Sequence, residues 1–143
     1  MNEAGCRPTL VIGLGCQRGC PTSVLQGLIE VSLREHRLTL ADITALASID
    51  IKSSESGLLE LAEYLGLPLG FFSADELAAF EPQLSHRSQI AFDNTGCHGV
   101  AESAALAMAS RLSGSPAKLV IERRNSSRAT FALAEARTGR SNL

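Results

Sequence analysis

Three short polar loops hold most of the residues that could bind an anion or move a proton. The first loop, Gly13–Thr22, contains glycines that let backbone N–H groups approach a ligand, together with a thiol and a guanidinium. A helix that starts directly after this loop adds partial positive charge, which suits a carboxylate or a phosphate. The predicted ligand-binding residues here are Gly13, Gly15, Cys16, Arg18 and Gly19. The alternative is that the glycines only permit a tight turn and that Arg18 is solvated.

The second loop, Ser48–Gly57, follows an apolar run that reads as a buried strand. Asp50 comes directly after that run, where an acid could activate water. The predicted ligand-binding residues in this loop are Ser48 and Lys52. Alternatively, Asp50 or Ser56 only caps the next helix, and Lys52 pairs with Glu55.

The third loop, Asn94–Glu102, leads into an alanine-rich helix. We predict that Thr95, Gly96 and Gly99 bind ligand and that His98 and Glu102 act with Asp50 as acids or bases. A solvated His98 is the alternative, and the helix dipole alone would favour a carboxylate at position 102. No GxGxxG, P-loop, HExxH, EF-hand or Ser–His–Asp pattern is present, so spacing alone indicates only an anion-binding domain.

Composition excludes several classes of function. The formal net charge is -2 and only 4% of the residues are aromatic, which argues against a nucleic-acid surface. No apolar run is long enough to cross a bilayer, and no signal peptide is evident, so we expect a cytoplasmic protein without a membrane partner. The cysteines lack zinc-site spacing, so we expect no metal, no cofactor and unpaired thiols. A disulfide or redox pair of Cys16 and Cys20 is the alternative.

Alternating strand and helix patterns must position these loops. They predict a three-layer α/β/α sandwich, with a mostly parallel mixed sheet of about five strands and a C-terminal β-hairpin. The expected strands are Thr9–Gly15, Thr44–Ile49, Leu69–Phe72, Ala117–Arg123 and Arg128–Ala134. The expected helices are Thr22–His36, one from about Ser56 to Leu65, one from Ser73 to about Phe80, and Val100–Ser113. The chain reads as one domain, 1–143, with a core at 8–135 and frayed termini.

Two local expectations are less regular. In the first helix, Val24, Leu28 and Val31 are predicted to face the core, flanked by Leu25 and Ile29. The segment Glu81–Gly99 has weak periodicity and is predicted to be largely irregular.

Four ordered blocks resemble the CobE/CbiG C-terminal domain family of cobalamin (vitamin B12) biosynthesis. Gly13–Gly19 (GLGCQRG) is similar to that family's GIGCRRG, and Thr95–Ala105 to its TGSPGVAEAAAL. The other two blocks are Ala47–Lys52 followed by Gly57–Ala62, and Leu67–Ser73. The resemblance covers about residues 8–135. Cys20-Pro21 and Cys97-His98 depart from the family pattern.

The resemblance implies a role in handling a precorrin or corrin intermediate, alongside other enzymes of the cobalamin pathway. Such rings carry acetate and propionate carboxylates, which Arg18, Lys52 and backbone N–H groups could bind together. One alternative is a CbiG-like hydrolase that opens a precorrin lactone or removes an acyl group. A phosphate- or nucleotide-binding module is the other. Each reading requires the three loops to meet at one rim of the sheet.

Overall fold

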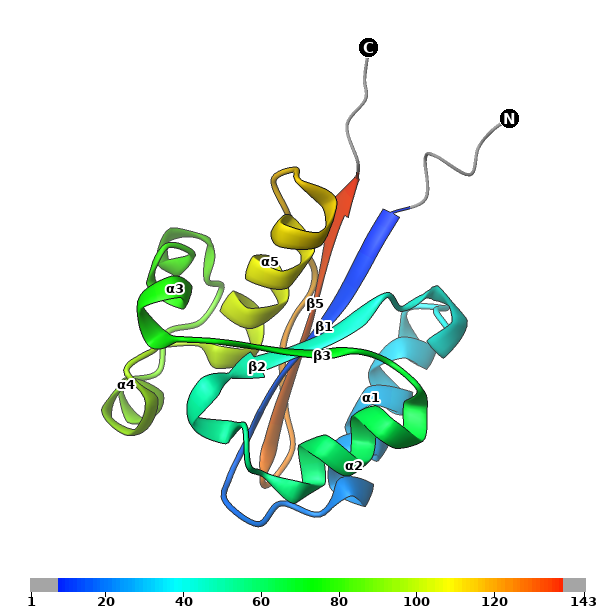
Figure 1. Cartoon of the computed structure of the whole chain (residues 1–143), viewed down its shortest axis with the longest axis horizontal. Coiled ribbons are helices and arrows are strands. Elements are labelled where there is room, and N and C mark those ends of the chain that lie inside the picture. The colour runs from blue at the N-terminus through cyan, green and yellow to red at the C-terminus, as the bar shows by residue number, and fades with distance from the viewer. Residues whose placement is uncertain (1–7, 138–143) are drawn as a thin grey trace.

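The computed structural model describes residues 8–137, which form one five-stranded sheet with helices on both faces (Figure 1). The predicted frayed termini and Cys6 lie outside the described residues. The strands are β1 (Pro8–Cys16), β2 (Ala45–Ile49), β3 (Leu69–Phe72), β4 (Lys118–Asn125) and β5 (Ala129–Arg137). The α-helices are α1 (Thr22–Glu35), α2 (Ser56–Leu65), α3 (Ala74–Ala78), α4 (Gln89–Thr95) and α5 (Val100–Ser113). Short 3-10 turns are η2 (Leu40–Asp42), η3 (Asp50–Lys52) and η4 (Glu81–Gln83).

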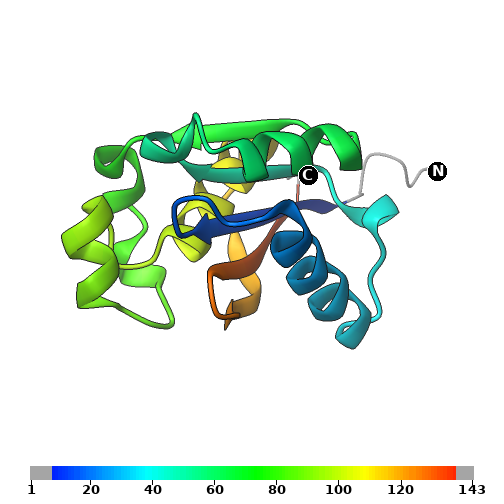
Figure 2. The ribbon, with the colours of Figure 1, turned by 90° about the horizontal axis from the view of Figure 1, so that it is seen from below.

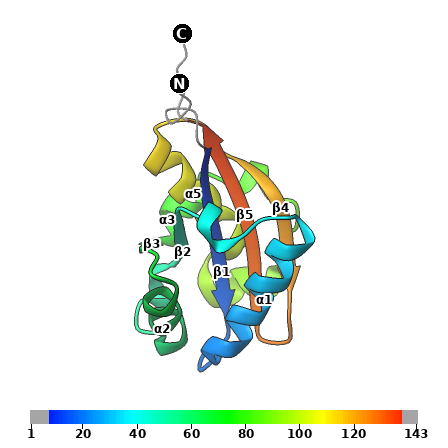
Figure 3. The same cartoon turned by 90° about the vertical axis from the view of Figure 1, so that its right-hand side faces the viewer.

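The strands lie in the order β3-β2-β1-β5-β4, which Figure 3 shows from the side. β1, β2 and β3 pair in parallel, whereas β5 runs antiparallel to both β1 and β4. Only β5 is therefore reversed, and the predicted mixed sheet with a C-terminal hairpin is confirmed. Because Cys16 at the end of β1 pairs with Ala129 at the start of β5, the hairpin turn reaches the same edge as the loop after β1.

The core divides between the two faces of the sheet, which confirms the three-layer architecture. Alternation along β1 sends Leu10, Ile12 and Leu14 towards α1 and α2, and Val11 towards α5. Both faces of this strand are buried, as expected for the centre of a sheet. Figure 1 shows α3 and α4 on the side of the sheet opposite α1 and α2.

Helix α5 lies unusually close to β1, and a glycine makes this contact possible. A Cβ atom added at Gly13 would lie 1.8 Å from the carbonyl oxygen of Ala101. The small side chains of α5, including Ala104 and Ala105, are fully buried against the sheet. The glycine therefore serves helix-to-strand packing, a steric role different from the tight turn that was the alternative to ligand binding.

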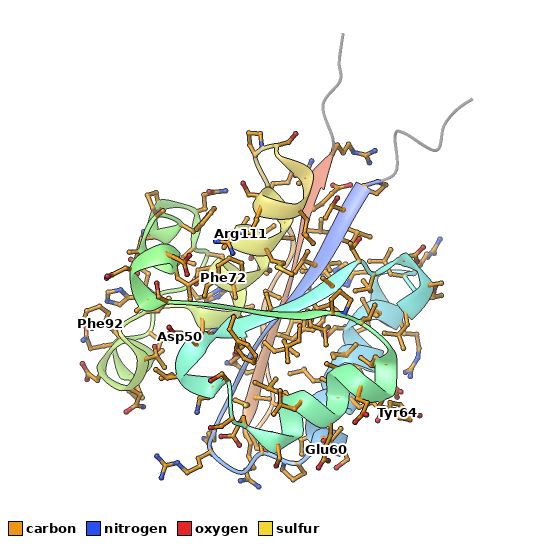
Figure 4. The ribbon with its side chains drawn as sticks, viewed as in Figure 1. Asp50, Glu60, Tyr64, Phe72, Phe92 and Arg111 are labelled. Carbon is orange, nitrogen blue, oxygen red and sulfur yellow. The ribbon has the colours of Figure 1, made fainter. Side chains whose placement is uncertain are left out.

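An ion pair between Glu76 of α3 and Arg111 of α5 links these two helices. Its Ser73–Glu76 capping box forms as predicted, with the Glu76 N–H donating to the Ser73 hydroxyl at 3.1 Å. Glu76 also accepts from Arg111 of α5 at 3.1 Å. The Arg111 guanidinium lies 4.5 Å from the centre of the buried Phe72 ring (Figure 4).

Two local expectations need correction. In α1, Val24 and Leu28 are half-buried against the core as predicted, but the fully buried apolar residues are Leu25, Ile29 and Leu33, and Val31 is 42% exposed. Both stripes are apolar, and the fully buried one faces the space where α1 packs against α2 and β5. The segment 81–99 is also more regular than expected, because it contains η4 and α4.

Candidate functional site

A cavity of about 930 Å³ lies where the loop after β1, the loop after β2 and α4 come together. Figure 2 looks onto this edge of the molecule from below, with the dark blue loop after β1 near its centre and α4 at its left. The first loop contributes Cys16, Gln17, Arg18 and Gly19, the second Ile51, Lys52, Ser54, Glu55 and Ser56, and α4 contributes Ala91, Asn94 and Thr95. The parallel strands β1 and β2 end at this edge, the usual place for ligands in an open α/β sheet.

Hydrogen bonds tie the first two loops to each other. The Gly19 N–H donates to the Glu55 carboxylate at 2.7 Å, and the Thr22 hydroxyl donates to the Gly57 carbonyl at 3.0 Å. Gly19 has a φ of 76°, a left-handed conformation that favours glycine and turns its N–H towards the second loop. Glu55, rather than Asp50 or Ser56, occupies the N-cap position of α2. These hydrogen bonds therefore preorganise this wall of the cavity for a ligand.

The third wall is α4, which starts and stops at recognisable signals. The Ser88 hydroxyl accepts from the Ala91 N–H at 3.1 Å, and Gly96 ends the helix at a φ of 79°. The Ser88 N–H donates to the His98 carbonyl at 2.9 Å, which closes the segment on itself. Ala91, Asn94 and Thr95 follow helical spacing, so one face of α4 lines the cavity.

The cavity contains two cationic side chains and one anionic one. Arg18 is exposed and Lys52 is half-buried. Neither belongs to any ion pair found within residues 8–137, so Lys52 does not pair with Glu55 as the alternative supposed. One oxygen of Glu55 already accepts the Gly19 N–H. A ligand with several carboxylates would therefore find an excess of positive charge.

Cys16 lines the cavity as an uncharged thiol. Burial raises its pKa from 9.0 to about 11, and the nearby Lys52 charge offsets only part of that effect. Burial also raises the pKa of Cys20. Because the thiolate is the nucleophile, Cys16 is a weak one at neutral pH. Cys16, Cys20 and Cys97 are all free thiols.

Five of the predicted site residues line this cavity: Cys16, Arg18, Gly19, Lys52 and Thr95. The Thr95 hydroxyl is also bonded to the Ala91 carbonyl at 2.6 Å, so it supports the end of α4. The other predicted residues do not line the cavity: Gly13, Gly15, Ser48, Asp50, Gly96, His98, Gly99 and Glu102.

Several of these residues have structural contacts that explain their presence. The buried Ser48 hydroxyl donates to the Leu14 carbonyl at 2.7 Å and joins β2 to β1. A Cβ atom at Gly15 would lie 2.6 Å from the Thr130 hydroxyl, and one at Gly99 would lie 3.2 Å from Leu84.

No hydrogen bond or ion pair found within residues 8–137 joins any two of the three predicted catalytic residues. The His98 ring donates to the Glu81 carboxylate at 2.9 Å, and this hydrogen bond lowers the pKa of Glu81. The same ring stacks on Phe92, with 4.4 Å between the ring centres. Glu102 is 1% exposed and accepts from the Ser85 hydroxyl and N–H and from the Arg123 N–H. Asp50 is exposed at the start of η3, next to the cavity-lining Ile51 (Figure 4).

Sequence reasoning did not assign seven other cavity-lining residues to the site: Gln17, Ile51, Ser54, Glu55, Ser56, Ala91 and Asn94. The α4 residues were missed because no helix was predicted there, although Ser88 and Gly96 are ordinary start and stop signals. Within residues 8–137, no group of three His, Cys, Asp or Glu residues is placed to hold a metal ion. No helix in the same range is long and apolar enough to cross a membrane.

Comparisons with known proteins agree with this fold. Residues 10–134 match the family described as "Cobalamin synthesis G C-terminus". "Protein CobE" of Sinorhizobium sp is 38% identical over 125 residues, which cover 87% of this chain and 79% of that protein. "Cobalt-precorrin-5A hydrolase" of Priestia megaterium is 36% identical over 97 residues, and these span 68% of this chain but only 25% of the hydrolase.

Two solved structures resemble the whole described fold. One is that of CobE, a protein from the cobalamin (vitamin B12) biosynthetic pathway, with a TM-score of 0.87 and 44% identity over 90% of this chain and 94% of that one. The other is cobalamin biosynthesis protein chiG from Agrobacterium tumefaciens str. C58, with a TM-score of 0.66 and 30% identity over 88% and 97% of the two chains. The expected fold class and the resemblance drawn from four sequence blocks are both confirmed.

Proposed function

The chain belongs to the cobalamin synthesis G C-terminal family, and from that premise we propose that it binds a precorrin or corrin intermediate in the cavity beside β1 and β2. It is a cobalamin biosynthesis protein, so a ligand from that pathway is the natural candidate. The cavity volume of about 930 Å³ lies near the top of the usual range for small-molecule sites, which suits a large ring.

The observation that carries this proposal is that Arg18 and Lys52, from two different loops, line one cavity without a carboxylate partner. Acetate and propionate arms of the ring would supply the missing charge. Arg can bind a carboxylate through two parallel N–H groups, and Lys binds it as a point charge. Ile51 and Ala91 offer apolar contacts to the ring, while Asn94 can donate to an arm.

A binding or carrier role fits the cavity better than catalysis. His98 and Glu102, two of the three groups expected to activate water, do not line it and already have protein partners. Hydrolysis of a precorrin lactone or acyl group is the second candidate, because the chain resembles part of a cobalt-precorrin-5A hydrolase. Asp50 would then be the base, and Asp50→Asn would abolish product release while leaving ligand affinity intact.

Binding can be tested by absorbance titration with hydrogenobyrinic acid, a corrin that keeps its carboxylates free. We expect Arg18→Ala and Lys52→Ala each to weaken binding about tenfold, which corresponds to about 1.4 kcal/mol for one lost charge-assisted contact. The loss of affinity caused by each substitution should be smaller at high salt, because salt screens the attraction between these side chains and the carboxylates of the ligand.

Matched controls come from the same residue types elsewhere. Arg34 lies exposed on α1 and Lys118 lies exposed on β4, and neither lines the cavity. Arg34→Ala and Lys118→Ala should leave the affinity within about twofold of the parent protein. Equal affinities for all four variants, or no spectral change with the parent protein, would refute the proposal.

A further inference from the structure

The hairpin turn between β4 and β5 forms a fourth loop at the rim of the cavity. Antiparallel pairing of β5 with β1 brings this turn to the carboxyl end of β1. The Gln17 N–H donates to the Arg128 carbonyl at 2.9 Å, which fastens the turn to the loop after β1. In Figure 2 the dark blue loop after β1 lies between the teal loop after β2 and the orange hairpin turn.

A second cavity, of about 220 Å³, lies between this turn and the loop after β1. Cys16 and Gln17 line both cavities, so they form a shared wall. The second cavity is smaller than the usual small-molecule site, so it is too small for a macrocycle but has room for a side arm. The exposed lining of this cavity is mainly apolar, and its polar groups come from the end of β4, the turn and the start of β5, with Asn125, Arg128 and Thr130 among them.

Arg128 supplies the charge in this second cavity. Arg128 is half-buried, and its guanidinium makes one side-chain hydrogen bond within residues 8–137, in which Nη2 donates to the Arg18 carbonyl oxygen at 3.3 Å in an exposed position. A guanidinium has five N–H donors, so most of its capacity is unused by that contact. None of the ion pairs between residues 8 and 137 includes Arg128, whereas Arg124 on the same hairpin pairs with Glu35 of α1.

We propose that Arg128 and the hairpin turn form a second subsite, which takes a carboxylate arm of the ligand whose ring occupies the larger cavity. This inference rests on the proposed corrinoid-binding function and names the part of the ligand that the second cavity recognises. A ring with carboxylates around its edge can place one arm on Arg18 and Lys52 and another across the Cys16–Gln17 wall on Arg128. Two anchored arms would fix the orientation of the ring, which one anchor cannot do.

The test compares two probes, hydrogenobyrinic acid and its fully amidated derivative. Arg128→Ala should weaken binding of the acid about tenfold but change binding of the amide by less than about twofold, because only a carboxylate gains from the charge. Arg128→Gln keeps a side-chain donor for the Arg18 carbonyl while removing the charge, and it should behave like Arg128→Ala. Arg124→Ala is the control, since that side chain points to α1 and its exposed ion pair contributes little.

Each outcome separates the subsite from the proposed function. If Arg18→Ala weakens binding of the acid but neither Arg128 variant does, the second subsite is refuted and the corrinoid-binding function stands. If the Arg128 variants weaken binding of the acid and the amide equally, Arg128 only supports the wall and the subsite is again refuted. If none of these variants changes affinity, both proposals fail.

Discussion

Replacing Gly13 with alanine should destabilise the fold strongly, although it adds a single methyl group. The new Cβ atom would lie 1.8 Å from the carbonyl oxygen of Ala101 and 2.8 Å from the backbone nitrogen of Ala105. Both clashing atoms belong to the backbone of α5, so no side-chain rotation can relieve the contact. The helix and β1 would have to separate.

The size of the effect follows from how firmly α5 is held. Real Cβ contacts essentially never fall below 3.0 Å, so the separation needed is roughly 1 Å. Helix α5 packs on β1, β2 and β5 together, and moving it would loosen the buried alanine face across the sheet. Overpacking of this kind typically costs about 1–3 kcal/mol, and a backbone clash belongs at the upper end.

Urea unfolding followed by circular dichroism measures this loss. With a slope of about 2 kcal/mol per molar urea, a loss of about 3 kcal/mol lowers the midpoint by about 1.5 M. Gly27→Ala is the matched control, because Gly27 lies inside α1 and an added Cβ would meet nothing within 4 Å. That change should raise the midpoint slightly, since alanine stabilises a helix interior by about 0.5–1 kcal/mol relative to glycine.

A Gly13→Ala variant with an unchanged midpoint would refute the reasoning, because it would show that α5 does not lie against β1 at this distance. A variant that keeps its stability but loses ligand affinity would restore the ligand-binding role predicted for Gly13.

Two further predictions concern a buried hydroxyl and a half-buried thiol. Ser48→Ala should lower the free energy of unfolding by about 1–2 kcal/mol, because the Leu14 carbonyl loses the 2.7 Å hydrogen bond from the buried Ser48 hydroxyl. Ser53 is exposed, so the control Ser53→Ala should change the free energy of unfolding by less than about 0.5 kcal/mol in the same urea assay. Cys16, with its pKa raised to about 11, should react with iodoacetamide at pH 8 about a hundredfold more slowly than a thiol of pKa 9.0, and the rate should keep rising towards pH 11. Peptide mass spectrometry locates the modified thiol, and rapid labelling of Cys16 in the folded protein at pH 8 would contradict the raised pKa.

Local signals in the sequence were enough to predict most elements. Apolar runs marked the strands β1, β2 and β3, and the Ser73–Glu76 capping box marked the start of α3. The hairpin was evident from two strand patterns around a short polar turn. These features depend on residues near one another in the chain, so they can be read without knowledge of the fold.

The first two loops could also be placed together in advance. Strands joined by helical crossovers run parallel, so the segments after β1 and β2 had to meet at one edge of the sheet. Arg18 and Lys52 were predicted as partners at a common site for this reason, and they do line one cavity. Their role in binding a ligand stays a prediction.

Only the tertiary structure decided which residues complete that cavity. The close approach of α5 gives Gly13 a packing role. Glu102 and His98 form hydrogen bonds with other protein groups. Burial and long-range contacts determine which polar groups are bonded within the protein, and the local sequence does not show these contacts. The pairing of β5 with β1 brought Arg128 beside Arg18, although 110 positions separate them in the chain. Strand order and register depend on which apolar faces can be buried together, and that is a property of the whole fold.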